Sequence, residues 1–277
     1  MTLLPGRELA AGIRAEAAAA AGELTENGRQ PRLAVVTATS DESTAWYVRS
    51  IANAAVRAGI ACDVQHTNTS AGIRATLAQL ADDPEVHGVI LATPLPGGTR
   101  LAELATAIPL AKDVDGASPD SLGRLAAGLP AFAPATAEAV LALLDHHGIE
   151  LSGRRAVVVG RSVVVGKPVA HLLLDRDATV TVAHSRTADL PALTRQAEIL
   201  VVAAGRAGLI GPAHVSPGTV VIDVGTNATS EGGLAGDVDP AVASLAALAP
   251  VPGGVGPVTT ALLLRHVVQA ARASQGS

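Results

Sequence analysis

The sequence feature that most constrains the fold is an alternation of short apolar runs with longer segments of helical composition. The apolar runs lie at 33–37, 61–65, 87–92, 156–159, 179–184, 199–203 and 220–224. Segments rich in good helix formers lie beside them, at 7–25, 43–58, 70–81, 135–147, 166–174 and 258–272. Strands and helices that alternate in this order form largely parallel sheets covered by helices. The sequence therefore predicts the α/β class.

The alternation occurs twice, which indicates two domains. A length of 277 residues is sufficient for two ordinary α/β domains. The first series ends near Pro134, and we assign the last helix, which follows the second sheet, to the first domain. The prediction is a domain of residues 1–134 plus 258–277, a Rossmann-like domain of residues 135–257, and a cleft between them.

The composition excludes several classes of protein. Apolar residues make up 48% of the chain and charged residues 16%, which is incompatible with a disordered protein. The net charge of −5 argues against a nucleic-acid partner. No apolar run reaches the roughly 18 residues that cross a membrane, and residues 1–7 lack a secretory signal. Cys62 is the only cysteine, so no disulfide can form within the chain, which fits a reducing compartment. Together these features predict a cytoplasmic protein without a membrane partner.

A glycine-containing turn marks the best candidate for a cofactor site. The apolar run 156–159 leads into Gly160–Pro168, and a helix follows. A strand, a glycine turn and a helix place backbone N–H groups where the phosphates of a dinucleotide can bind. The spacing is not G-x-G-x-x-G, so an ordinary turn between strand and helix is the alternative.

The end of the next strand favours NADP over NAD. An Asp or Glu at this place usually holds the ribose hydroxyls of NAD. This chain instead has His184-Ser185-Arg186-Thr187, and Arg161 lies in the preceding turn. Two guanidinium groups suit a 2′-phosphate, which arginine can bind through two hydrogen bonds. Asp189 is near enough in sequence to leave NAD as the alternative.

Several further segments occur in an order that is specific to one enzyme family. They are Lys112-Asp113-Val114-Asp115-Gly116, Gly160–Pro168, Ala183-His184-Ser185-Arg186-Thr187, Asp223-Val224-Gly225-Thr226-Asn227, Gly236-Asp237-Val238-Asp239 and Pro250-Val251-Pro252-Gly253-Gly254-Val255-Gly256-Pro257. Over nearly its whole length the chain resembles the methylenetetrahydrofolate dehydrogenase/cyclohydrolase family, the FolD type. The resemblance implies a homodimer that binds a folate substrate between its domains and NADP on the middle domain.

The resemblance also implies roles for individual residues. Tyr47 would stack on the pterin and Asp115 would hydrogen-bond its amino-pyrimidine edge, and these two are the candidate catalytic residues. The substrate would be lined by Leu95, Pro252, Gly253, Gly254 and Pro257. The cofactor would contact Thr136, Gly160, Arg161, Ser162, Gly166, Pro168, Ser185, Arg186, Gly205, Gly225 and Thr226. No metal site is expected, because the histidines lack ligand companions.

Each of these roles has a purely structural alternative. Tyr47 could be a core aromatic, and Asp115 could form the turn before Gly116. The Pro-Gly-Gly segment could be an ordinary loop. Lys112 and Asp113 could simply pair with each other.

Two departures from the family pattern fall on the residues of the cyclohydrolase step. The family's Y-V-x-x-K, whose lysine carries out that step, reads Tyr47-Val48-Arg49-Ser50-Ile51 here. The family's V-Q-L-P-L-P, whose glutamine orients the lysine, reads Leu91-Ala92-Thr93-Pro94-Leu95-Pro96. Smaller departures occur at 38–44 and 134–139. The cofactor half of the pattern is intact, whereas the substrate half is altered.

The two departures predict which of the two family reactions survives. Hydride transfer needs positioning but no protein acid or base at the reacting carbon, whereas hydrolysis of the methenyl product is acid–base chemistry. The sequence predicts NADP-dependent oxidation of 5,10-methylenetetrahydrofolate to 5,10-methenyltetrahydrofolate, with cyclohydrolase activity lost or strongly reduced. The alternatives are a specialised-metabolism paralogue acting on another folate adduct or an imine, and a non-catalytic NADP- or folate-binding protein.

Overall fold

The computed structural model describes residues 2–39, 42–229 and 233–274. The chain forms two compact units. The first unit holds the residues up to Ala10 together with Thr136–Thr259, and the second holds Ala11–Ala135 and the residues from Thr260 onward. Each unit contains one parallel sheet, which confirms the predicted α/β class.

The second unit is built on a three-stranded parallel sheet with the order β2-β1-β3. The strands are β1 (Arg32–Thr37), β2 (Ala61–His66) and β3 (Gly88–Leu91). The helices are α2 (Glu42–Arg57), α3 (Ser70–Asp82), α4 (Leu101–Ala105) and α5 (Pro119–Ala126), with parts of α1 (Arg7–Glu26) and α9 (Val255–Ala273). Short 3-10 turns lie at Pro96–Gly98 and Leu110–Lys112.

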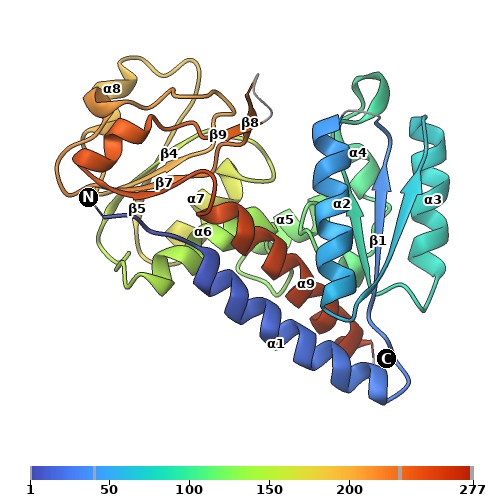
Figure 1. Ribbon diagram of the computed structural model, residues 1–277. Helices are drawn as coiled ribbons and strands as arrows, with labels where there is room; N and C mark the ends of the chain where they lie inside the picture. Colours follow the sequence, from blue (N-terminus) through green and yellow to red (C-terminus); the bar gives the residue numbers. More distant parts are fainter. Residues whose placement is uncertain (1, 40–41, 230–232, 275–277) are drawn as a thin grey trace. The chain divides into compact units, whose positions relative to one another are not determined.

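Alternate side chains of β1 enter two different cores. Leu33 and Val35 pack with residues of α1, α2 and α9, whereas Ala34 and Val36 pack with residues of α3 and α4. This alternation follows from the two-residue period of a strand. Accordingly, α2 and α3 flank β1 on opposite sides (Figure 1). Leu264 of α9 belongs to the first of these cores, as expected from assigning the last helix to this domain.

The first unit contains a five-stranded parallel sheet with the order β10-β7-β6-β4-β5. Its strands are β4 (Arg155–Val159), β5 (Thr179–Ala183), β6 (Ile199–Val202), β7 (Val220–Asp223) and β10 (Ala247–Ala249), and β8 (Asn227–Ala228) pairs with β9 (Leu234–Ala235). Its helices are α6 (Ala135–His146), α7 (Gly166–Leu174) and α8 (Leu190–Thr194), with 3-10 turns at Pro212–His214 and Pro240–Ser244. The strand order reverses beside β4, and doubly wound folds bind ligands at the carboxyl ends of the strands at such a reversal.

The N-terminal segment lies in a different unit from the one that we predicted. The division at residues 134 and 258 falls within two residues of the boundaries in the structure, but residues up to Ala10 group with the first unit. Backbone hydrogen bonds explain the difference. The N–H of Leu4 donates to the carbonyl of Leu248 at 2.9 Å, and the N–H of Gly6 donates to the carbonyl of Gly253 at 2.8 Å.

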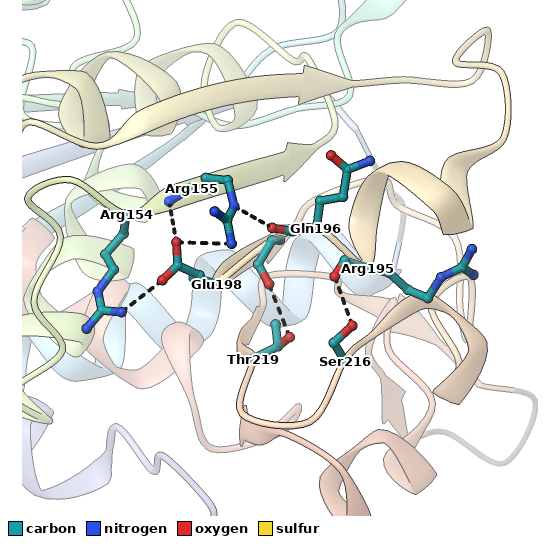
Figure 2. Close-up of polar contacts among 8 residues, drawn as sticks. Arg154, Arg155, Arg195, Gln196, Glu198, Ser216 and Thr219 are labelled. Carbon is teal, nitrogen blue, oxygen red and sulfur yellow. Dashed lines mark hydrogen bonds and ion pairs between the residues drawn. The ribbon is translucent and has the colours of Figure 1, made fainter.

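The amino ends of the first unit's strands are joined by polar side chains (Figure 2). The carboxylate of Glu198 lies 2.8 Å from Nη1 of Arg154 and accepts from the backbone N–H of Arg155 at 3.1 Å. The hydroxyl of Thr219, which is buried, donates to the carbonyl of Ala197 at 3.2 Å. Exposed ion pairs contribute about 0–1 kcal/mol each. Doubly wound folds bind their ligands at the opposite, carboxyl edge of the sheet.

The helices and strands otherwise follow the predicted pattern, with differences at short or glycine-rich segments. The last helix begins at Val255 rather than at residue 258, so Pro257 lies in its first turn, where the missing proline N–H costs no hydrogen bond. The short elements α4, α5, α8 and β10 are not predicted, because three to eight residues hold too little periodicity. Among the described residues, no helix combines the length and apolarity that crossing a membrane requires.

Candidate active site

The turn after β4 brings two backbone segments into close contact. The φ of Gly160 is 130°, and a Cβ at this position would collide with the carbonyl oxygen of Ala203 at the end of β6. A Cβ on Gly166 would collide with the carbonyl oxygen of Gly160. Both positions therefore require glycine. The close approach lies at the reversal of strand order, where a dinucleotide phosphate can reach the backbone.

The residues between these glycines form the start of α7. The hydroxyl of Ser162 accepts from the N–H of Val165 at 3.2 Å and from that of Gly166 at 3.4 Å. Pro168 is buried in the first turn of the helix, whereas Arg161 is exposed. The predicted residue Ser162 thus holds the backbone at the start of α7, and the guanidinium of Arg161 remains accessible to a ligand.

The end of β5 lies directly beside this turn. The N–H of Gly160 donates to the carbonyl of Ala183 at 2.9 Å, so Ser185 and Arg186 follow a strand adjacent to β4. Both Ser185 and Arg186 are exposed. The carboxylate of Asp189 accepts from the N–H of Ala192 at 3.1 Å and caps α8. Asp189, the acid that left NAD as the alternative cofactor, therefore caps a helix.

A buried carboxylate organises the loop after β6. Oδ2 of Asp237 accepts from the N–H groups of Ala204 at 2.6 Å and Gly205 at 2.8 Å. Oδ1 accepts from the N–H of Arg206 at 2.8 Å and from the side-chain amide of Asn227 at 2.9 Å. Three successive backbone N–H groups form a concave anion site, and here the protein's own carboxylate fills it.

A second buried carboxylate, Asp223, holds the segment that carries Asp237. It accepts from the backbone N–H groups of Gly225 at 2.9 Å, Asp237 at 3.0 Å and Val238 at 3.0 Å. Burial raises the pKa of Asp223 to about 6, and the charge of Asp237 adds to this, although the three N–H bonds oppose it. A Cβ on Gly225 would overlap Asp237, which explains glycine at that position.

Four predicted cofactor residues of this unit remain, and they are Gly205, Gly225, Thr226 and Thr136. Gly205 and Gly225 are placed by the two buried carboxylates, and Thr226 is exposed beside Gly225. Thr136 is half-buried in the first turn of α6.

The Pro-Gly-Gly segment forms a tight turn into α9. The N–H of Gly254 donates to the carbonyl of Pro250 at 2.8 Å, and Gly253 has a φ of 109°. A Cβ on Gly6 would collide with the carbonyl of Gly254. Pro252 is exposed and Pro257 is half-buried. The segment is therefore a packed turn rather than an ordinary loop, and its role towards a substrate stays a prediction.

In the second unit, α2 carries one exposed and one buried member of the predicted site. Tyr47 is 38% exposed, which excludes the alternative of a core aromatic. Ile51, one helical turn later, is completely buried. Ala92, directly after β3, belongs to the same apolar core as Ile51, and Leu95 is half-buried nearby in the chain. The hydroxyl of Thr44 donates to the carbonyl of Thr93 at 3.2 Å, which ties the start of α2 to the end of β3.

The two positions at which the sequence analysis notes a departure from the family pattern are both buried in one apolar cluster. Ile51 and Ala92 share one core, and neither offers a titratable or hydrogen-bonding side-chain group. Of the altered segment 38–44, residues 40 and 41 lie outside the described residues.

A turn stabilised by Asp113 presents Asp115. The completely buried carboxylate of Asp113 accepts from the N–H groups of Ala117 at 3.1 Å and Ser118 at 2.9 Å, and from the hydroxyl of Ser121 at 2.6 Å. The turn is thus formed by the side chain of Asp113, and not by that of Asp115 as the structural alternative proposed. Asp115 itself is half-buried.

Lys112 and Asp113 do not pair with each other, contrary to one of our alternatives. Nζ of Lys112 donates to the carbonyls of Leu80 and Ala81 at 2.9 Å each and of Asp83 at 2.6 Å. These carbonyls end α3, where a positive charge is favourable. Lys112 therefore closes a helix, and Asp113 builds the turn.

The acidity of Asp115 is shifted towards neutral pH. Desolvation raises its pKa to about 7, the charge of Asp113 raises it further, and His266 opposes the shift. Desolvation and then the charge of Asp115 also raise the pKa of the Tyr47 hydroxyl. A partly buried carboxyl such as that of Asp115 can bind a ligand that presents hydrogen-bond donors.

The sequence analysis assigned no role to Asp113, Asp223, Asp237 or His266. A signal was present for the acids, because aspartate is almost never fully buried unless it is paired, and Asp223 ends an apolar strand. Within the described residues, no group of three His, Cys, Asp or Glu side chains could hold a metal ion.

Comparison with known proteins identifies the two halves of the chain. Residues 4–115 match the tetrahydrofolate dehydrogenase/cyclohydrolase catalytic domain, and residues 134–275 match the NAD(P)-binding domain of the same family. A protein of Saccharopolyspora erythraea called bifunctional protein FolD 1 is 63% identical over 279 residues, covering 99% of this chain and 95% of that protein.

Two solved structures agree with the match over the whole chain. A bifunctional FolD methylenetetrahydrofolate dehydrogenase/cyclohydrolase of Campylobacter jejuni has a TM-score of 0.95 and 39% identity, covering 99% of each chain. The FolD of Trypanosoma brucei, complexed with NADP and an inhibitor, has a TM-score of 0.94 and 33% identity, covering 100% of this chain and 99% of that one. The prediction of a Rossmann-like domain for NADP is confirmed at the level of the family. The chain belongs to the tetrahydrofolate dehydrogenase/cyclohydrolase family.

Proposed function

We propose that this protein oxidises 5,10-methylenetetrahydrofolate to 5,10-methenyltetrahydrofolate with NADP, and that its cyclohydrolase activity is lost or strongly reduced. The burial of Ile51 and Ala92 in one apolar core is the observation that carries the second half of the proposal.

The residues of the first unit fit a dinucleotide. The contact between Gly160 and Ala203 leaves backbone rather than side chains at the phosphate position. The exposed side chains of Arg161, Ser185 and Arg186 follow two adjacent strands and suit a 2′-phosphate. When bound, NADP would supply the hydride acceptor.

The residues of the second unit fit a pterin. Tyr47 is partly exposed, and its ring would stack on the pterin. The carboxyl of Asp115 would accept hydrogen bonds from the amino-pyrimidine edge. Hydride transfer then needs the folate held in place, because the methylene carbon loses its hydride without a protein acid or base.

Hydrolysis of the methenyl product makes a different demand. Water must attack the cationic carbon and protons must move, which requires a positioned acid–base group. Ile51 and Ala92 stand where the family has lysine and glutamine, and their side chains can neither donate nor accept a proton. The relative of S. erythraea is called bifunctional, so the loss of the second activity is proposed for this chain on its own residues.

One assay tests both halves of the proposal. The protein is incubated with methylenetetrahydrofolate and NADP, and NADPH and the methenyl product are followed separately by absorbance. We expect the methenyl compound to accumulate in step with NADPH and then to decay at the rate of a protein-free buffer. Decay well above that rate would reject the loss of cyclohydrolase activity.

A second candidate function follows from the altered sequence of segment 38–44. A paralogue acting on another folate adduct or on an imine would bind NADP but show no turnover with methylenetetrahydrofolate. A non-catalytic binding protein would show no turnover with any one-carbon folate.

A homodimer, as predicted from the family, would appear in light scattering at twice the mass of one chain.

A further inference from the structure

His266 contacts the turn that carries Asp115 from another element. It lies on α9, is 2% exposed, and its Nδ1 is 2.7 Å from the carbonyl oxygen of Val114. Because a carbonyl oxygen only accepts, Nδ1 carries the hydrogen in this bond. The imidazole also lies against the ring of Phe132, with a centroid distance of 4.8 Å. The orientation of the ring is therefore fixed by both contacts.

The hydrogen bond fixes one of the two peptide planes beside Asp115. The carbonyl of Val114 and the N–H of Asp115 belong to the same planar peptide unit, so holding one holds the other. The next plane is fixed by the N–H of Gly116, which donates to the carbonyl of Asp113 at 2.9 Å. With both planes held, the carboxyl of Asp115 can move only by rotation of its own side chain.

The opposite side of the turn is also closed. Gly116 has a φ of 60°, and a Cβ there would lie 2.5 Å from the carbonyl oxygen of Phe132 and 2.6 Å from the nitrogen of Pro134. The turn cannot shift towards this segment. From α9, His266 donates a hydrogen bond to this turn.

We propose that His266 is a positioning residue, which aims the Asp115 carboxyl at the substrate by holding the Val114–Asp115 peptide plane through its Nδ1–H group. This inference rests on the proposed role of Asp115 in folate binding. It predicts that the donor position matters more than the size of the side chain.

Two variants separate a positioning role from a packing role. The amide nitrogen of asparagine occupies nearly the place of Nδ1, whereas that of glutamine lies one bond further out. Glutamine is the closer match to histidine in volume. Positioning therefore predicts that His266→Asn resembles the wild type and that His266→Gln does not, and packing predicts the reverse order.

The experiment measures kcat and KM for methylenetetrahydrofolate at saturating NADP, with the Kd for NADP as the control. We expect the KM of His266→Asn to stay within about twofold of the wild type and that of His266→Gln to rise about tenfold, the cost of leaving a buried carbonyl unpaired. The Kd for NADP should change in neither variant. Equal KM values, or a lower KM in His266→Gln than in His266→Asn, would overturn the inference.

A second measurement needs no variant and covers the case in which one does not fold. The imidazole ¹⁵N shifts of the wild-type protein should report a hydrogen on Nδ1 of His266, and a hydrogen on Nε2 alone would overturn the inference. The proposed function fails separately, if the wild type does not reduce NADP with methylenetetrahydrofolate at all.

Discussion

The carboxyl edges of the two parallel sheets share a topology but differ in chemistry. In each sheet the first strand lies between the next two strands of the chain. In the first unit β4 lies between β5 and β6, and in the second unit β1 lies between β2 and β3. At the edge of the first unit, backbone meets backbone at Gly160 and Ala203. In the second unit, Ala92 directly follows β3, and it is buried in one apolar core with Ile51 of α2.

The difference separates two ways of building a site. A site made of backbone is fixed by glycines and by buried carboxylates such as Asp237, so a substitution there disturbs the fold itself. A site made of side chains can lose one reaction through two substitutions that keep the core packed. On the proposed function, the cofactor half would stay intact while the substrate half changes.

The largest expected effect is the return of hydrolysis at the side-chain site. Ile51→Lys combined with Ala92→Gln should raise methenyl hydrolysis above background by about 10²–10⁴-fold, the usual contribution of a positioned acid–base group. Ile51→Lys alone should give a smaller gain in methenyl hydrolysis than the double change. It should also lower the melting temperature, because it places an unpaired ammonium in an apolar core. The measurement is loss of methenyl absorbance.

The matched control is Ile51→Met with Ala92→Gln, which adds a long side chain without a charge. A similar gain in this control, or a folded Lys–Gln variant that still hydrolyses at background, would refute the comparison between the two edges.

The backbone site should respond strongly to one added methyl group. Gly160→Ala should weaken NADP binding by about thirtyfold, or about 2 kcal/mol, because the Cβ collides with the carbonyl of Ala203 and moves the turn. Gly211→Ala is the control, since a Cβ there meets open space and its φ is −109°. Calorimetric titration with NADP gives both affinities. Equal affinities would mean that the close approach does not shape the cofactor site.

The sequence predicts those parts of the structure that depend on local pattern. The runs around β1, β4 and β7 are apolar because parallel strands are buried on both faces, and the glycine at 160 follows from the strand–turn–helix order. Such features are visible within a window of about ten residues.

The contacts that assemble the site join residues far apart in the chain, so no local pattern announces them. Asp237 binds N–H groups 31 to 33 positions earlier, and His266 binds a carbonyl 152 positions earlier. Residues 2–10 join the first unit for the same reason, through backbone bonds to residues near 250. The pairing of Lys112 with Asp113, one of the structural alternatives, does not occur because the carbonyl partners of Lys112 belong to a helix end 29 to 32 residues earlier.

A smaller effect is expected for the choice of cofactor. Arg161→Ala should reduce the preference for NADP over NAD by about tenfold, because one of two exposed guanidinium groups near the 2′-phosphate is lost. Arg155→Ala, at the amino edge of the same strand, is the control and should leave the preference unchanged. Both Kd values are measured for each variant. A wild type that binds NAD and NADP equally well would remove the basis of the assignment.

The smallest expected effect is a pH dependence confined to the substrate unit. The pKa of Asp115 is about 7, well above its usual value, because the folded protein desolvates the charged form. Stability from this group is therefore present in full below its unfolded pKa and is lost as pH rises through about 7.

The pH dependence of folate binding should have the opposite sign, because only the ionised carboxylate accepts hydrogen bonds with both oxygens. Raising the pH from about 6.5 to about 7.5 should lower the KM for methylenetetrahydrofolate about threefold, as the ionised fraction rises from about a quarter to about three quarters. The KM of Asp115→Asn, whose side chain does not titrate, should stay constant over the same range at saturating NADP. If that variant shows the same threefold fall, the titrating group lies elsewhere, and the two edges differ in structure without differing in their response to pH.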